Sequence, residues 1–79
     1  MLESMNPHYK KILAILATLR PDVTEWSDTV LDALHENGIN YSRSRVHGWG
    51  VSPASKNYRH MTSDELLDVL ESVYLWLQK

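Results

Sequence analysis

Basic side chains near the middle of the chain are the residues best suited to bind a partner. Four of the eight lysines and arginines lie between residues 37 and 63, and no aspartate or glutamate falls in that segment. Because an arginine fork can donate to two acceptors on guanine or to a phosphate, the segment predicts a surface for double-stranded DNA. Its basic and histidine residues are Arg43, Arg45, His47, Lys56, Arg59 and His60.

The net charge of −2 conceals this segment, because all ten acidic residues lie in the flanks. A separation of charge along the chain can steer a polyanion even where the total charge is slightly negative. The alternative explanation is that acidic residues gather at helix N-termini, where the helix dipole favours them, while loops do not collect them.

Other chemistries lack their residue patterns. The chain has no cysteine, and its four histidines are not spaced three or four residues apart, which predicts no metal site. No serine lies in a Gly-x-Ser-x-Gly turn, and Gly48-Trp49-Gly50 lacks the lysine of a phosphate loop. The acidic pairs at helical spacing, Asp28 with Asp32 and Asp64 with Asp68, are expected to be solvated. We therefore predict a protein that is not an enzyme and has no cofactor.

Two helices are expected before the basic segment. Asn6 is typical of a helix cap and Pro7 of the first helical position, and apolar residues then recur at helical spacing until Pro21. The second helix begins either at a capping box formed by Asp22 and Glu25 or near residue 27.

A short third helix and a long fourth helix complete the pattern. Gly38 favours the end of the second helix, and Ser42 can cap a third helix of about two turns that stops at the glycines around Trp49. Residues 51–61 show no period and predict an ordered loop held by Tyr58. A second capping box at residues 62–65 starts the last helix, whose core-facing seam is expected to be Leu66, Leu70, Tyr74 and Leu77.

These elements predict an all-α fold, a single four-helix domain over residues 1–79. A helix-turn-helix-like unit is expected at about 24–49 and the C-terminal helix at about 63–78, and the second helix of such a unit lies in the DNA major groove. Val46 and Trp49 would face the core, although a helical core could require these two residues while the arginines are merely solvated. The expected contacts are Arg43, Ser44 and His47 on the outer face, Arg45 beside them, and Lys56, Arg59 and His60 from the loop.

The C-terminal helix carries more apolar residues than a monomer of this size can bury. Val69 and Trp76 lie beside the expected core seam, and Leu75 points in a third direction. We expect these three residues to form a homodimer or heteromeric interface, and the alternative is that they pack back onto the first helix. A dimer would suit a DNA-binding protein, because it presents two recognition helices about one DNA turn apart.

Several motifs occur in a fixed order between residues 28 and 74. Gly38-Ile39-Asn40-Tyr41-Ser42-Arg43 precedes Val46 and Trp49, and Tyr58 and Leu66 stand nine and seventeen residues after that tryptophan. With Ser63-Asp64-Glu65-Leu66 and the apolar run from Leu70 to Tyr74, this order resembles one repeat of the bacterial YehS-like family. The resemblance implies a helical, helix-turn-helix-like module with no known catalytic residues. The family's helix continues with lysines where this chain has glycine and valine, at positions 50 and 51. The small size and single unit are also similar to phage Cro-like regulators.

Together these features predict a small DNA-binding transcription regulator from a phage or bacterium, dimeric and cytoplasmic. Residues 1–6 lack the basic and apolar regions of a signal peptide, and no apolar run approaches the roughly 20 residues of a membrane span. The alternative function is a protein-binding modulator, such as an antirepressor, that grips a larger transcription factor. Its contact surface would comprise Tyr41, Arg43, Arg45, Trp49, Tyr58 and Arg59.

Overall fold

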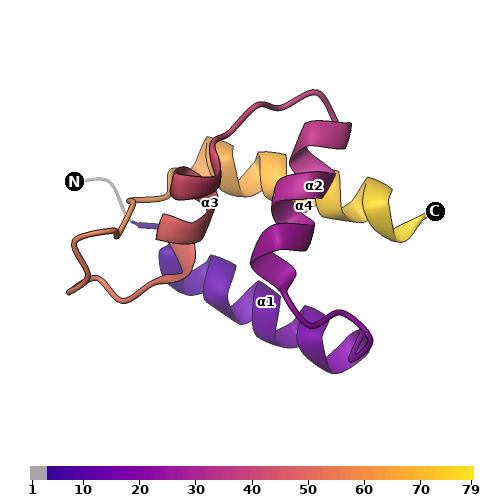
Figure 1. Cartoon of the computed structure of the whole chain (residues 1–79), viewed down its shortest axis with the longest axis horizontal. Coiled ribbons are helices and arrows are strands. Elements are labelled where there is room, and N and C mark those ends of the chain that lie inside the picture. Colours follow the sequence, from indigo (N-terminus) through magenta and orange to yellow (C-terminus); the bar gives the residue numbers. More distant parts are fainter. Residues whose placement is uncertain (1–3) are drawn as a thin grey trace.

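The computed structural model describes residues 4–79, which form four helices and no strand (Figure 1). The helices are α1 (Asn6–Leu19), α2 (Trp26–Glu36), α3 (Arg43–Gly50) and α4 (Ser63–Leu77). The predicted all-α, four-helix fold is thus confirmed. No helix within residues 4–79 combines the length and apolar character needed to cross a membrane. The sequence predicts no signal peptide at residues 1–6, and the first three of these residues lie outside the described part.

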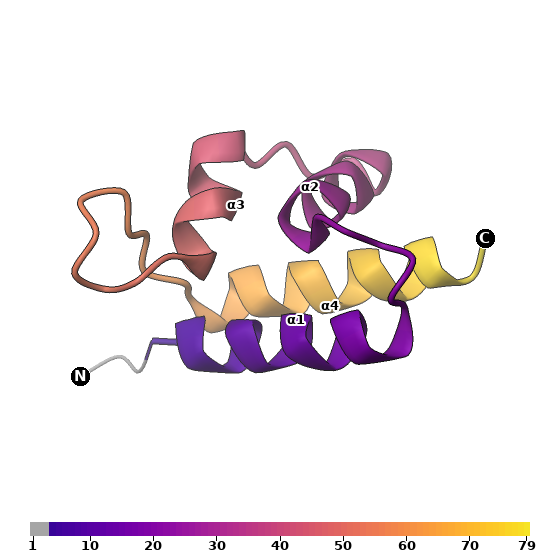
Figure 2. The ribbon, with the colours of Figure 1, turned by 60° about the horizontal axis from the view of Figure 1, so that its bottom comes forward.

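The four helices form two layers. Figure 2 shows α1 and α4 running in the same direction beneath α2 and α3. Helix α2 packs mainly on α4 and α3, and α1 packs on α3. Trp49 is fully buried between the layers and meets the rings of Tyr9 and Tyr41 edge-on, with centroid distances of 5.8 and 5.4 Å. Val46 is 1% exposed, so both core positions predicted on α3 are confirmed.

The helix signals around α3 and α4 form as the sequence predicts. The hydroxyl of Ser42 accepts a hydrogen bond from the backbone N–H of Arg45 at the start of α3. Thr62 and Glu65 make both bonds of the capping box that starts α4. Gly38 ends α2 with a φ of 77°, a left-handed conformation that glycine adopts without steric cost.

The capping box predicted at the start of α2 is wrong. Glu25 occupies the cap position without a side-chain bond, and α2 begins at Trp26, close to the alternative start near residue 27. The carboxylate of Asp22 instead accepts hydrogen bonds of 3.0 and 2.9 Å from the Arg20 guanidinium. This hydrogen bonding lowers the pKa of Asp22 below its usual value. The carboxylate that the capping box requires is thus held by two bonds from Arg20, and α2 starts only at Trp26.

The core-facing seam predicted on α4 is also wrong. Leu70 and Tyr74 are 40% and 61% exposed, whereas the residues buried on α4 are Glu65, Val69, Ser72 and Val73. Val69 is fully buried in the core and therefore cannot form a surface between subunits, which corrects the dimer contact predicted for it. Trp76 is half-buried, edge-on to Trp26 at 5.8 Å, and Leu75 is exposed.

Polar partners decide which face of α4 turns inward. Apolar residues cover so much of this helix that hydrophobicity alone does not fix its rotation. The polar residues on the inward side find partners on other elements: Glu65 binds Arg45, and Ser72 Oγ accepts a 3.2 Å bond from the amide of Asn37. Buried polar groups cost free energy unless they are hydrogen-bonded, so these pairs select the observed rotation.

A buried asparagine joins the start of α1 to both ends of the loop over residues 51–62. Asn6 is 3% exposed and does not cap its helix as predicted, because Met5 holds the cap position. Its amide nitrogen donates to the carbonyl oxygens of Trp49 (3.0 Å) and Arg59 (2.8 Å). Its amide oxygen accepts from the backbone N–H of Met61 at 2.8 Å. The predicted ordered loop is therefore held mainly by Asn6.

Tyr58, the residue expected to hold the loop, makes a smaller contribution. Its hydroxyl lies 3.1 Å from that of Ser4, and its side chain is half-buried. Two turns within the loop, closed by the backbone bonds from Ser55 to Ser52 and from Tyr58 to Ser55, stiffen it further.

Replacing Asn6 with alanine should destabilise the fold. The change leaves two carbonyls and one N–H without their partner, and we expect a loss of about 3 kcal/mol in the free energy of unfolding. Urea denaturation followed by circular dichroism measures it. Asn40→Ala is the matched control, because Asn40 is exposed and should change stability by less than about 0.5 kcal/mol. Equal effects of the two variants would contradict this role of Asn6.

Candidate functional site

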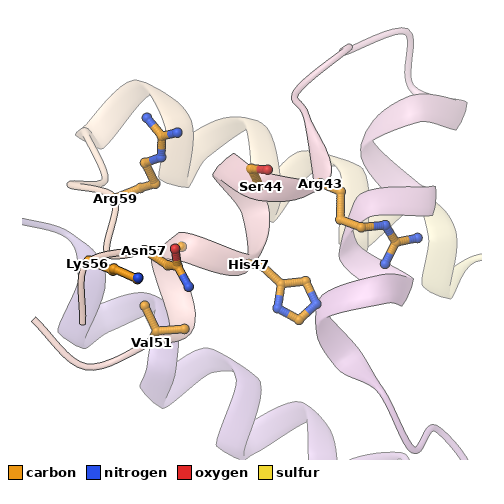
Figure 3. A pocket seen from close by; sticks show the side chains of 8 residues that line it. Arg43, Ser44, His47, Val51, Lys56, Asn57 and Arg59 are labelled. Atoms are coloured by element: carbon orange, nitrogen blue, oxygen red, sulfur yellow. The ribbon is translucent and has the colours of Figure 1, made fainter.

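An open hollow of about 410 Å³ lies between α3 and the loop, and we call it the basic hollow (Figure 3). Helix α3 forms one wall and the loop forms the other. No carboxylate lines it. The lining residues are Arg43, Ser44, His47, Gly48, Val51, Lys56, Asn57 and Arg59. The hollow therefore brings together five of the seven residues that the sequence predicts to contact a partner. They come from two separate segments, residues 43–47 and 56–59.

Gly48 allows the loop to approach α3 closely. The backbone N–H of Arg59 donates to the Gly48 carbonyl at 3.0 Å. A Cβ at position 48 would lie 2.3 Å from the Arg59 Cγ and 2.6 Å from the Asn57 carbonyl oxygen, so no larger residue fits without a shift of the loop. The side chain of Arg59 therefore rests on the bare backbone of α3, with its guanidinium exposed at the edge of the hollow.

The cations of the basic hollow differ in their pairing. The guanidinium of Arg43 points toward α2 in Figure 3, and its Nη1 lies 2.5 Å from the carboxylate of Asp28. The ring of His47 is 3.9 Å from the same carboxylate. Lys56 and Arg59 are exposed and make no ion pair within residues 4–79. Of the three cations in the hollow, these two carry charge that no neighbouring acid balances.

Two of the predicted contact residues lie outside the basic hollow. Arg45 Nη1 is 2.6 Å from Glu65 Oε2, and its guanidinium sits over the ring of Tyr41, so it ties α3 to α4. His60 is exposed beyond the end of the hollow. The hydroxyl of Tyr41 donates to Asp68 at 2.7 Å, and this hydrogen bond together with burial raises the pKa of Tyr41 to about 12.

Sequence reasoning missed three contributors to the site. Asn57 adds an amide to the lining, Asp28 neutralises the charge of Arg43, and Gly48 allows the loop to approach α3 closely. The glycine could have been recognised as a signal, because a glycine inside a short helix usually marks a close backbone approach. Nothing in the sequence indicates that Asp28 of α2 reaches Arg43.

Comparisons of this chain with family models, curated proteins and solved structures find no match. The YehS-like resemblance and the Cro-like similarity therefore stay predictions. Within residues 4–79, no cluster of three or more histidine, aspartate or glutamate side chains is placed to hold a metal ion.

Gly48→Ala should displace the loop and reduce stability. The added methyl group would overlap Arg59 and Asn57, and overpacking of this kind costs about 1–3 kcal/mol. Thermal unfolding and limited proteolysis within residues 51–62 measure the two effects. Gly50→Ala is the matched control, since a Cβ there would meet only the Tyr9 ring, at 3.8 Å. Faster cleavage of the loop in the Gly50 variant than in the Gly48 variant would contradict the role of Gly48.

Arginines 43 and 45 should respond differently to alanine. Arg45→Ala removes the partner of a nearly buried carboxylate, Glu65, and should cost about 1.5 kcal/mol of stability. Arg43→Ala breaks only an exposed pair with Asp28 and should cost less than about 0.5 kcal/mol. Chemical denaturation of both variants checks this difference, and equal losses would contradict the assignment of Arg45 to the scaffold.

Proposed function

We propose that this protein is a DNA-binding regulator that holds backbone phosphates in the basic hollow. The observation that carries the proposal is the pair Lys56 and Arg59, two exposed cations without an acidic partner in a hollow without carboxylates. Phosphate contacts from lysine and arginine supply most of the affinity of DNA-binding proteins and set their register on the duplex.

The neutral donors of the hollow suit the same ligand. Ser44 and Asn57 line it beside the cations, and hydroxyl and amide groups commonly bind phosphate oxygens. Ser44 stands next to Arg43 on α3 and Asn57 next to Lys56 in the loop, so each wall of the hollow offers a neutral donor beside a cation.

Arg43 is available to DNA despite its pair with Asp28. Both side chains are well exposed, at 64% and 47%, and exposed ion pairs are worth only about 0–1 kcal/mol. A phosphate or a guanine edge can therefore replace Asp28 at little cost. His47, on the next turn of α3, would then flank the same groove of the duplex.

The alternative function, a modulator that grips a transcription factor, is less well supported. Its contact surface would require exposed aromatic residues as energetic centres. Trp49 is fully buried, and the hydroxyl of Tyr41 is bound to Asp68. Two of the three aromatic residues of that surface thus pack in or against the core, and Tyr58 alone of the three lies outside it.

Salt dependence tests DNA binding. We expect fluorescence anisotropy with a labelled duplex of random sequence to show binding at about 50 mM salt that weakens steeply by about 200 mM. The double variant Lys56→Gln with Arg59→Gln should make the slope of log K against log salt shallower by about 2, since each phosphate contact contributes about 0.9. Glutamine keeps the Cβ and Cγ that rest on Gly48.

Lys79→Gln is the control for charge alone. Lys79 pairs with Glu36 near the C-terminal end of α4, and Figure 1 shows that end opposite the loop. This variant should bind DNA as the unmodified chain does. Absence of binding at about 50 mM salt, or an equal loss in the Lys79 variant, would overturn the proposal.

A further inference from the structure

Large apolar side chains remain exposed on the layer formed by α1 and α4. Leu19, Leu67 and Tyr74 are the most exposed, at 69%, 62% and 61%. Seven such residues lie on these two helices, and six of them share one side, which is unusual for a small monomer because exposed apolar patches generally mark interaction surfaces. We call this set the apolar face; it consists of Ile15, Leu19, Leu67, Leu70, Tyr74 and Leu77.

The two helices of the apolar face are in register. The backbone N–H of Met5 donates to the Met61 carbonyl at 3.0 Å, so α1 and α4 start at the same level. Figures 1 and 2 both show the helices running in the same direction from that point. With an equal rise of about 1.5 Å per residue in both helices, Ile15 lies within about one turn of the level of position 71, and Leu19 within about one turn of that of position 75.

The exposed flanks of the two helices turn toward each other. On α1, Ile15 and Leu19 lie on the side of the buried stripe that also carries half-buried Ile12. On α4, Leu70 and Leu77 lie on the other flank of the buried stripe when both helices are viewed from their N-termini, together with half-buried Leu66. Both helices are right-handed, run in the same direction and bury one side against the layer of α2 and α3. Since α1 lies nearer the viewer in Figure 2, the exposed flank of α1 faces the exposed flank of α4. The apolar face is therefore continuous across both helices.

We propose that a second copy of this chain covers the apolar face, in a two-fold dimer where α1 of each copy lies along α4 of the other. Charge complementarity supports this occupant. Helix α1 carries two lysines and no acidic residue, whereas α4 carries no basic residue and keeps two exposed acidic ones, Asp64 and Glu71, besides Glu65 and Asp68, which bind Arg45 and Tyr41. Pairing α1 with α4 joins opposite charges, and pairing each helix with its own copy would oppose like charges.

Lys11 and Glu71 are the charged residues nearest the apolar face. Lys11 is one turn before Ile15 on the same side of α1, and Glu71 lies one turn after Leu67. Both are exposed, although Glu71 also accepts a 2.8 Å bond from Asn37. A two-fold axis parallel to the helices brings Lys11 level with residue 67 of the other copy, about one turn from its Glu71.

The same axis places both basic hollows at one end of the dimer. Each loop lies at the end where α1 and α4 begin, and a rotation about an axis along the helices keeps that end in common (Figures 1 and 2). Two hollows could thus contact one partner. The dimer itself does not depend on DNA binding, since its surface lies outside the basic hollow.

Sedimentation equilibrium at micromolar concentration tests the dimer. We expect a mass about twice 9.1 kDa for the unmodified chain. Leu70→Glu should raise the dimer dissociation constant by at least about a hundredfold while circular dichroism stays unchanged, because it puts a charge at the centre of the apolar face. Tyr74→Ser, at a still more exposed position, should weaken the dimer without threatening the fold.

Leu75→Glu is the matched control on the same helix. Leu75 is 44% exposed, close to the 40% of Leu70, but lies on the other side of α4. This variant should remain dimeric. A species of 9.1 kDa alone at up to about 100 μM, or a dimer that Leu75→Glu dissociates and Leu70→Glu does not, would overturn the proposal.

A charge exchange tests the pairing of α1 with α4. Lys11→Glu should weaken the dimer by about tenfold, and adding Glu71→Lys should restore it, because the exchanged charges again attract. Failure of the second change to restore a dimer weakened by the first would overturn this arrangement of the helices.

Discussion

The rest of the structure depends on one buried carboxamide, that of Asn6. Its two polar atoms meet the end of α3 and two residues near the end of the loop, Arg59 and Met61, so a single side chain joins α1, α3 and the loop. An amide suits this position because it donates to two carbonyls and accepts from one N–H within a few ångströms. A loop of this length rich in polar residues would otherwise leave its backbone groups to water, and the wall of the basic hollow opposite α3 would not be defined.

Much of the fold follows from local signals in the sequence. Ser42, Gly38 and the capping box at 62–65 act within their own turn, so their neighbours along the chain suffice to predict them. The rotation of α4 does not follow, because the apolar side of that helix is wider than the face it buries and partners on α2 and α3 select its inward side. The start of α2 was predicted wrongly for a related reason: the carboxylate of Asp22 pairs with Arg20 instead of capping the helix. Local capping rules hold where no charged side chain competes.

Sequence patterns predicted most of the residues that line the site, but not how their side chains are arranged. Helical period placed Arg43, Ser44 and His47 on the outer side of α3, and they do line the basic hollow. The period placed Arg45 beside that outer face but still among the contacts, since only the tertiary position of Glu65 assigns it to the scaffold. For Lys56 and Arg59, the sequence supplied the charge, while their approach to α3 depends on Gly48 and on distant Asn6. Charge distribution along a chain thus indicates which segment meets a partner before it indicates which side chains do.

The bonds of Asn6 also impose an order on the assembly of the molecule. They join residues 43, 53 and 55 positions apart in the chain, the longest-range hydrogen bonds that α1 makes. Helices can form within their own segments in microseconds, but contacts between distant residues must first overcome the entropy of closing the intervening chain. During synthesis, Asn6 leaves the ribosome long before Met61 exists, so its amide stays hydrogen-bonded to water until its partners in the chain have been made. The end of the molecule that carries the basic hollow therefore closes only once Met61 has been made, and a nascent chain can form its first three helices before it acquires its site.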